Sequence, residues 1–298
     1  MDFTTNSPAY HHLKKKWTNY HKESQQKVWD NHGNHLNWLS RNFPSKHLLA
    51  GSLGGLLLLT SPNQPVQGFY QNIENSDQIT KDTDHNILLV SKLKDIVPNE
   101  MRKLTAEEEQ EISQILSDNL KFSVKVEIDN KRMNRNYGVI GGEQHLYRYP
   151  GDTLQKHADS ASDWAMYGSS GIAPGLGAWG YFAPSENEFT EKDKQRERYY
   201  IAIQTFLSPG FESRVAEYRD FFKFRKVLVV NPKTGQAVVT VVGDAGPAEW
   251  TGKHLGGSPE VMHYLGLAKG SRKGDVLYFF IDDPQDAIPL GPVEGPLN

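Results

Sequence analysis

Two valine-rich runs near the C-terminal end place the tightest constraint on how this chain folds. They span residues 226–230 and 236–242, and the short connection between them begins with Asn231 and ends with Gly235. Asn and Gly at the ends of so short a connection favour a β-hairpin. Gly243, Asp244 and Pro247 then interrupt the second run, because Gly and Pro break regular strands. The sequence therefore predicts an antiparallel hairpin that ends abruptly at a Gly/Pro loop.

The residues after this loop predict one short helix and one more strand. Ser258 has the character of an N-cap, Pro259 suits the first helical position, and Glu260 lies near the positive end of the helix dipole. The helix must end before Gly266, and residues 275–281 form an apolar run typical of a buried strand. Strands this close together, with one short helix between them, indicate a small barrel and not a doubly wound open sheet.

Composition excludes several classes of protein. The chain of 298 residues contains no Cys, so disulfides, thiolate metal sites and Cys nucleophiles are impossible. Only 37% of the residues are hydrophobic, which excludes a protein with many membrane spans. The net charge is -3, and the basic residues are scattered without the interleaved aromatics of nucleic-acid grooves, so we expect no nucleic-acid partner.

The first hundred residues divide into three parts. Residues 1–46 are a polar tail with seven Lys or Arg and three Asp or Glu, and residues 47–60 contain an uncharged Leu/Gly run. That run is shorter than the roughly 20 residues of a transmembrane helix but fits a signal-peptide core. We interpret residues 47–60 as a signal or membrane-anchor segment; the alternative is a buried Gly/Leu segment of a folded domain. Residues 61–100 are predicted to be a linker, and the protein to be extracytoplasmic, exported or anchored at the cell envelope.

Residues 101–165 are predicted to form a small α+β element ahead of the barrel domain, which is assigned to residues 166–298. Thr105 and Glu108 form the pattern of a capping box, and the apolar residues that follow it have helical spacing. Residues 122–128 alternate between apolar and polar side chains, which is the pattern of a half-buried strand.

The segment 226–266 resembles the double-psi β-barrel of the rare lipoprotein A family, and the related barrels of lytic transglycosylases and expansins. The resemblance rests on the hairpin loop ending at Gly235, the Val-rich strand, the Asp-x-Gly-Pro motif at Asp244, and the spacing from Ser258 to Gly266. It covers about a seventh of the chain. It implies a mainly β protein with a C-terminal six-stranded double-psi β-barrel, preceded by the small α+β element and a tethered N-terminal segment.

The resemblance also implies a chemistry. Lytic transglycosylases cleave a glycosidic bond with one acid/base residue, because the sugar's own hydroxyl closes on the anomeric carbon; Asp244 matches that residue. Two positions depart from the family pattern: Gly256 stands where the family has an acid before the helix, and Gln204 or Thr205 stands where it has a His. On this resemblance Asp244 is predicted to be the general acid/base. The alternative is that Asp244 has only a structural role in the turn.

Other candidate site residues surround this motif in the sequence. Glu249 is the best candidate for a second carboxylate, and His254 is either a proton-transfer partner or a surface loop residue. Sugar sites commonly contain exposed aromatic rings and hydrogen-bonding groups. The predicted substrate-binding residues are Trp250, Trp179, Tyr181, Ser170 and Gln204. We expect no cofactor and no metal ion.

The predicted function is remodelling of peptidoglycan, or cleavage of another polysaccharide, at the cell envelope. The alternatives are a non-catalytic, expansin-like glycan-binding module and an envelope scaffold. One further group contains the residue types of a catalytic triad but no nucleophile-elbow pattern: His145, His157, Asp159, Ser160 and Asp163. We interpret residues 145–152 as a polar seam that packs against the barrel.

Overall fold

The computed structural model describes residues 76–293. The predicted polar tail (1–46), the signal or anchor segment (47–60) and the beginning of the predicted linker lie outside the described residues. Among the helices of residues 76–293, none combines the length and the apolar character that crossing a bilayer requires.

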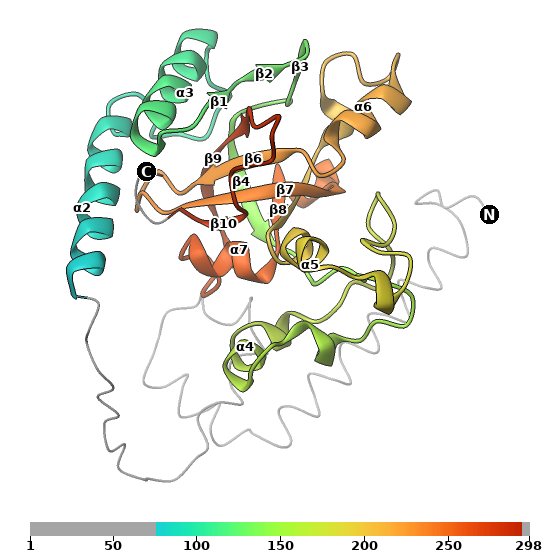
Figure 1. Ribbon diagram of the computed structural model, residues 1–298. Helices are drawn as coiled ribbons and strands as arrows, with labels where there is room; N and C mark the ends of the chain where they lie inside the picture. Colours follow the sequence, from blue (N-terminus) through green and yellow to red (C-terminus); the bar gives the residue numbers. More distant parts are fainter. Residues whose placement is uncertain (1–75, 294–298) are drawn as a thin grey trace, which may run out of the picture. The chain divides into compact units, whose positions relative to one another are not determined.

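Six strands close into a mixed β-barrel (Figure 1). Around the barrel, β9 is followed by β4, β8, β5, β7 and β6, and β6 pairs with β9 again. The pairs β4–β8 and β5–β7 are parallel, and the other four are antiparallel. The strands are β4 (Tyr137–Gly142), β5 (Tyr200–Ile203), β6 (Lys226–Val230), β7 (Ala237–Ala245), β8 (Leu255–Gly257) and β9 (Lys273–Ile281). The predictions of a mainly β fold and of a hairpin at β6–β7 are therefore confirmed.

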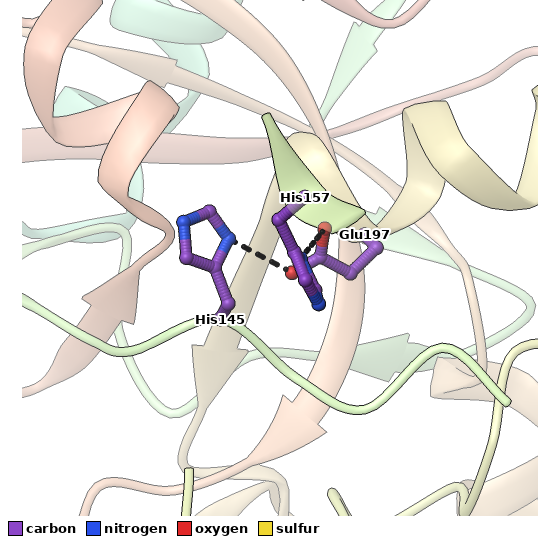
Figure 2. A group of neighbouring side chains, drawn as sticks. All are labelled: His145, His157 and Glu197. Carbon is purple, nitrogen blue, oxygen red and sulfur yellow. Dashed lines mark hydrogen bonds and ion pairs between the residues drawn. The ribbon is translucent and has the colours of Figure 1, made fainter. Parts of the chain in front are cut away.

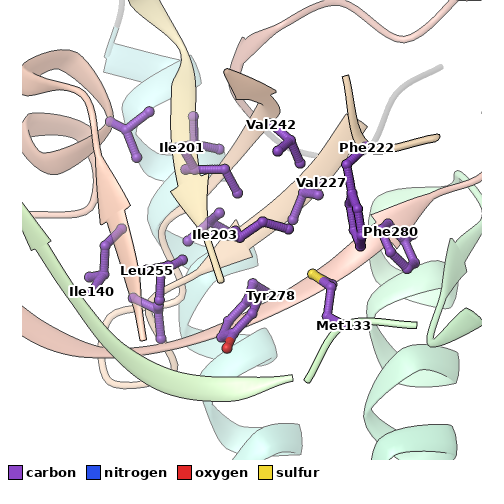
Figure 3. Close-up of a cluster of buried hydrophobic side chains, with 14 of the residues drawn as sticks. Met133, Ile140, Ile201, Ile203, Phe222, Val227, Val242, Leu255, Tyr278 and Phe280 are labelled. Carbon is purple, nitrogen blue, oxygen red and sulfur yellow. The ribbon is translucent and has the colours of Figure 1, made fainter. Parts of the chain in front are cut away.

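Aliphatic and aromatic side chains fill the barrel (Figure 3). Ile201 and Ile203 of β5, Val242 of β7, Leu255 of β8 and Tyr278 of β9 are all buried in this cluster. Because successive strand residues point to opposite faces, the residues between them face outward. Each fully buried side chain of this size contributes about 1.5–3 kcal/mol to folding.

A second apolar cluster joins two helices to the outside of the barrel. Leu89 and Leu93 of α2 (Ser76–Leu93) and Ile112 and Leu116 of α3 (Ala106–Leu120) are fully buried there, beside Phe279 of β9 and its neighbours. Helix α3 begins with the predicted capping box. Helix α2 corrects the prediction of a linker over 61–100: its leucines recur at helical spacing, so residues 85–93 pack as part of the domain.

The predicted boundary at residue 166 is wrong, because β4 belongs to the barrel although it lies within the expected separate element. The predicted strand over 122–128 is divided into β1 (Val124–Lys125) and β2 (Glu127–Ile128). The two pieces separate because they pair with different partners: β1 with β9, and β2 with β3 (Lys131–Arg132).

The segments between the barrel strands carry the remaining short elements. Residues 143–199 contain α4 (Ala161–Tyr167) and α5 (Glu191–Arg198). Helix α6 (Val215–Phe222) lies between β5 and β6, α7 (Pro259–Tyr264) follows β8, and β10 (Gly291–Pro292) pairs with β7. The side chain of Ser258 caps α7 and Pro259 occupies its first turn, as predicted.

Candidate functional site

Asp244 lies at the end of β7, with one carboxylate oxygen held by the backbone. The N–H groups of Ala178 and Ala245 both donate to its Oδ1, at 2.6 and 2.7 Å. Burial raises the pKa of Asp244, and these two hydrogen bonds oppose the increase without cancelling it. The half-buried side chain therefore has two properties of a proton donor: a fixed position and an increased tendency to be protonated.

A row of small residues leads from Asp244 across the outer face of the barrel. Asp244 pairs with Ala202 of β5, Ala202 with Gly256 of β8, and Gly256 with Gly141 of β4. Ile201, Ile203 and Leu255 fill the barrel, so Ala202 and Gly256 beside them face outward. A register shift in the β5–β7 pairing places Asp244 opposite Ala202, although Val242 two residues before Asp244 points into the barrel. Adjacent strands lie about 4.8 Å apart, which places the Cα of Gly256 about 10 Å from that of Asp244.

Two charged side chains lie over the glycines of this row. Glu143 follows β4, and its Oε1 is 2.3 Å from the point where a Cβ of Gly256 would lie. Lys253 similarly covers Gly141, with its Cδ 2.2 Å from the corresponding point. The two side chains form an ion pair of 2.8 Å, and both are partly exposed. Glu143 is not among the site residues predicted from the sequence; Gly141 and Gly142 immediately before it were the available signal of a close approach between chain segments.

Gln204 supports the loop after Asp244. Its buried Nε2 donates to the carbonyl oxygens of Pro247 and Lys253, at 3.1 and 3.3 Å. This loop contains a short 3-10 turn, Glu249–Thr251, and Trp250 within it is 88% exposed. An exposed indole of this kind is free to stack on a ligand, whereas Gln204 has the contacts of a loop brace.

The predicted aromatic residues before the hairpin differ in their exposure. The ring of Trp179 packs partly buried against the barrel core, and its Nε1 donates to the carbonyl oxygen of Val242 at 3.1 Å. Tyr181 is 39% exposed. Ser170 is partly exposed, and its Oγ lies 3.4 Å from a guanidinium nitrogen of Arg272. Because Ala178 contacts Asp244, the loop that carries Trp179 borders the acid directly.

The ring of His254 is engaged with the segment around β4. Its Nδ1 accepts a hydrogen bond from the backbone N–H of Val139 at 2.9 Å, and its Nε2 lies 2.6 Å from Nη1 of Arg135. Burial and the neighbouring charges of Arg135 and Lys103 lower the pKa of His254, which favours a neutral ring. Both ring nitrogens of His254 thus face groups other than Asp244. Glu249, the predicted second carboxylate, is exposed beside Trp250.

Three polar side chains, His145, His157 and Glu197, meet in a buried cluster outside the barrel (Figure 2). The Nδ1 atoms of His145 and His157 lie 3.2 Å from Oε1 and Oε2 of Glu197, respectively. The backbone N–H of Leu146 also donates to Oε1, at 3.1 Å. Glu197 comes from α5, His157 from the 3-10 turn Leu154–His157, and His145 from the segment after β4. No periodic pattern joins these positions, so sequence alone could not bring them together.

Asp152 and Arg148 extend this buried network. Oδ2 of Asp152 lies 2.9 Å from Nε2 of His157, and the same carboxylate accepts two hydrogen bonds from the guanidinium of Arg148, at 2.8 and 2.9 Å. Burial opposes ionisation of Asp152, but the bonds from Arg148 and His157 outweigh it and lower the pKa of the carboxyl. Both side chains of the Arg148–Asp152 pair are almost inaccessible to solvent.

Comparison with known proteins adds no assignment: no family model, curated protein or solved structure matches this chain.

Proposed function

We propose that this protein remodels peptidoglycan by glycan cleavage, with Asp244 as the general acid/base. The observation that carries the proposal is the position of Asp244: a partly buried carboxyl whose pKa is raised, held by two backbone N–H groups at the end of a barrel strand. A double-psi path of the barrel strands, and export to the envelope, belong to the same proposal. Protonation of the leaving-group oxygen is the step that such a carboxyl performs.

The geometry favours Glu143 over Glu249 as the second carboxylate. Glu143 lies over Gly256, two strands from Asp244 along the same outer row, whereas Glu249 is on the exposed turn of the following loop. The carboxylate of Glu143, which forms an ion pair with Lys253, would stabilise positive charge on the sugar in the transition state. Asp244 as the proton donor and Glu143 as the electrostatic stabiliser would divide the chemistry between them.

Trp250 supports the binding of a sugar close to these carboxylates. Within residues 85–293 it is the most exposed of the large hydrophobic side chains, at 88%, and it lies six residues after Asp244 on the loop that Gln204 braces. A pyranose presents an apolar face that stacks on such a ring. The same observation favours the second candidate function, a glycan-binding module without catalysis.

The test incubates the purified full chain with peptidoglycan sacculi and analyses the soluble products by mass spectrometry. Anhydro-muropeptides support lytic-transglycosylase chemistry, and ordinary reducing ends support hydrolysis. Sedimentation of the protein with the sacculi measures binding separately from cleavage.

Three variants make the assay decisive. Asp244→Asn removes the proton donor, Trp250→Ala removes the exposed ring, and Glu212→Gln changes an exposed acid on the way to α6 as a matched control. Cleavage that is lost in Asp244→Asn with sedimentation retained supports the enzyme. Sedimentation of wild type without any product supports the binding module, and the absence of both contradicts the proposal.

A further inference from the structure

The buried histidines and Glu197 present potential metal ligands at one point. One ligand atom from each of His145, His157 and Glu197 lies within 4.8 Å of the others. Two ligand atoms around a tetrahedral ion are about 3.4 Å apart, since zinc binds imidazole nitrogen and carboxylate oxygen at about 2.1 Å. The two Glu197–imidazole separations, each 3.2 Å and each to a different carboxylate oxygen, are close to that spacing. They also exceed the usual length of about 2.7–2.9 Å for a charged hydrogen bond.

The orientation of His157 has the arrangement that metal-binding histidines use. Its Nε2 faces the carboxylate of Asp152, which Arg148 holds with two hydrogen bonds, so its Nδ1 is the nitrogen that points to Glu197 (Figure 2). A carboxylate on the far nitrogen fixes the ring and makes the near nitrogen a stronger ligand. The backbone N–H of Leu146 likewise positions the carboxylate of Glu197.

Glu260 supplies a further carboxylate whose burial the protein's own groups do not explain. The residue is 3% exposed, and neither of its carboxylate oxygens has a hydrogen-bond partner among residues 76–293. It lies within electrostatic range of Glu197 and of His145. An unpaired buried carboxylate is costly, and buried charges are ordinarily paired or bound to a metal.

We propose that His145, His157 and Glu197 bind one zinc-class divalent ion. Imidazole and carboxylate ligands without thiolate suit such an ion. The three ligands and Glu260 are all buried, so we infer a structural role for the ion and not a catalytic one. The ion would join the segment after β4 to the turn Leu154–His157 and to helix α5, and its two charges would balance Glu197 and Glu260.

The test uses the full chain without an affinity tag, so that tag histidines contribute no metal binding. A background variant with His11, His12, His21, His32, His35 and His47 replaced by Ala removes the histidines of the N-terminal segment and leaves the buried residues intact. This variant is stripped with EDTA, dialysed, and titrated with zinc chloride in a calorimeter, and the bound metal is counted by mass spectrometry. We expect one equivalent of zinc and a higher melting temperature with zinc than without it.

Substitutions in the cluster identify the ligands. His157→Asn and Glu197→Gln should abolish the bound equivalent, and Asp152→Asn should weaken zinc binding about 10–100-fold, since it only positions His157. Should these variants fail to fold, ¹⁵N-histidine NMR of the background variant decides: zinc should shift the Nδ1 resonances of His145 and His157. No bound zinc in the background variant, full binding in a folded Glu197→Gln, or unmoved Nδ1 resonances would each overturn the proposal and leave a metal-free ionic network.

Discussion

Glu143 fills the space that a side chain on Gly256 would take. Its Cγ and Oε1 both lie 2.3 Å from the position of a Cβ on that glycine, so only glycine allows this carboxylate to lie over β8. The carboxylate thereby comes onto the outer row that ends at Asp244. An acid from the segment directly after β4 thus stands over β8 on the same row as Asp244.

Asp244→Asn should reduce glycan cleavage about 10²–10⁴-fold, which is the usual contribution of a general acid. The amide oxygen can still accept the hydrogen bonds from Ala178 and Ala245, so the loop should keep its shape. Product release from sacculi measures turnover, and urea unfolding provides the folding control. A folded Asp244→Asn variant with full activity would contradict the role of this residue.

The pH profile of the wild type should report the same group. A general acid acts in its protonated form, so turnover should decline as pH rises through the pKa of Asp244. Burial raises that pKa, which places the decline above the ordinary aspartate value of about 3.9. Initial rates across a pH series measure the position of the decline. A decline at or below the ordinary value would indicate a solvated carboxylate.

Gly256→Ala should displace Glu143 from the row and lower cleavage as much as Glu143→Gln does. The added methyl occupies the place of the Glu143 side chain, and partial exposure allows that side chain to move outward. Combining the two substitutions should cost no more than either one alone, because both remove the same carboxylate. Additive losses in the assay would show that Glu143 acts elsewhere. Glu249→Gln is the control and should change little.

The sequence predicted those parts of the fold that local patterns specify. The hairpin from Lys226 to Ala245, the capping box at Thr105 and the start of α7 at Ser258 all follow from residue types at fixed spacing. Strand β8 was missed because it has only three residues, two of them glycine. The His145–Glu197 contact could not be predicted, since partners 52 residues apart meet only through the barrel's closure.

Asp152→Asn should destabilise the metal-free protein by about 3–5 kcal/mol. The substitution leaves the guanidinium of Arg148 buried without a compensating charge, which costs more than an exposed pair contributes. Urea unfolding in EDTA measures the loss. Glu186→Gln is the matched control, because its pair with Lys156 is largely exposed and should contribute at most about 1 kcal/mol. Equal effects of the two substitutions would contradict the importance of burial.

Acidification should destabilise the folded domain, partly through protonation of Asp283. Burial opposes its ionisation, but hydrogen bonds from Lys226 and from the amides of Ile288 and Ala287 outweigh burial and lower its pKa. A carboxyl with a lowered pKa stabilises the fold above its unfolded value of about 3.9, and that stability is lost as pH falls through the folded pKa. Asp283→Asn should cost about 2 kcal/mol at pH 7 and show a smaller further loss on acidification. If Asp283→Asn and the wild type lose stability over the same acidic pH range, other carboxyls cause the acid unfolding.

Gly235→Ala should destabilise the domain by loosening α2 from the β6–β7 hairpin. Gly235 has a φ of +77°, and a Cβ there would lie 2.4 Å from the carbonyl oxygen of Asn86 in α2. The backbone of a helix cannot yield as a flexible side chain does, so the added strain of about 1–3 kcal/mol should separate the two segments. Hydrogen exchange should then show lost protection at Leu89 and Leu93, with the barrel strands still protected. Gly252→Ala is the control, since its φ of +66° is similar but no atom lies within 4 Å of its Cβ position. If Gly252→Ala costs as much as Gly235→Ala, backbone conformation alone explains the loss, and the contact with α2 contributes nothing.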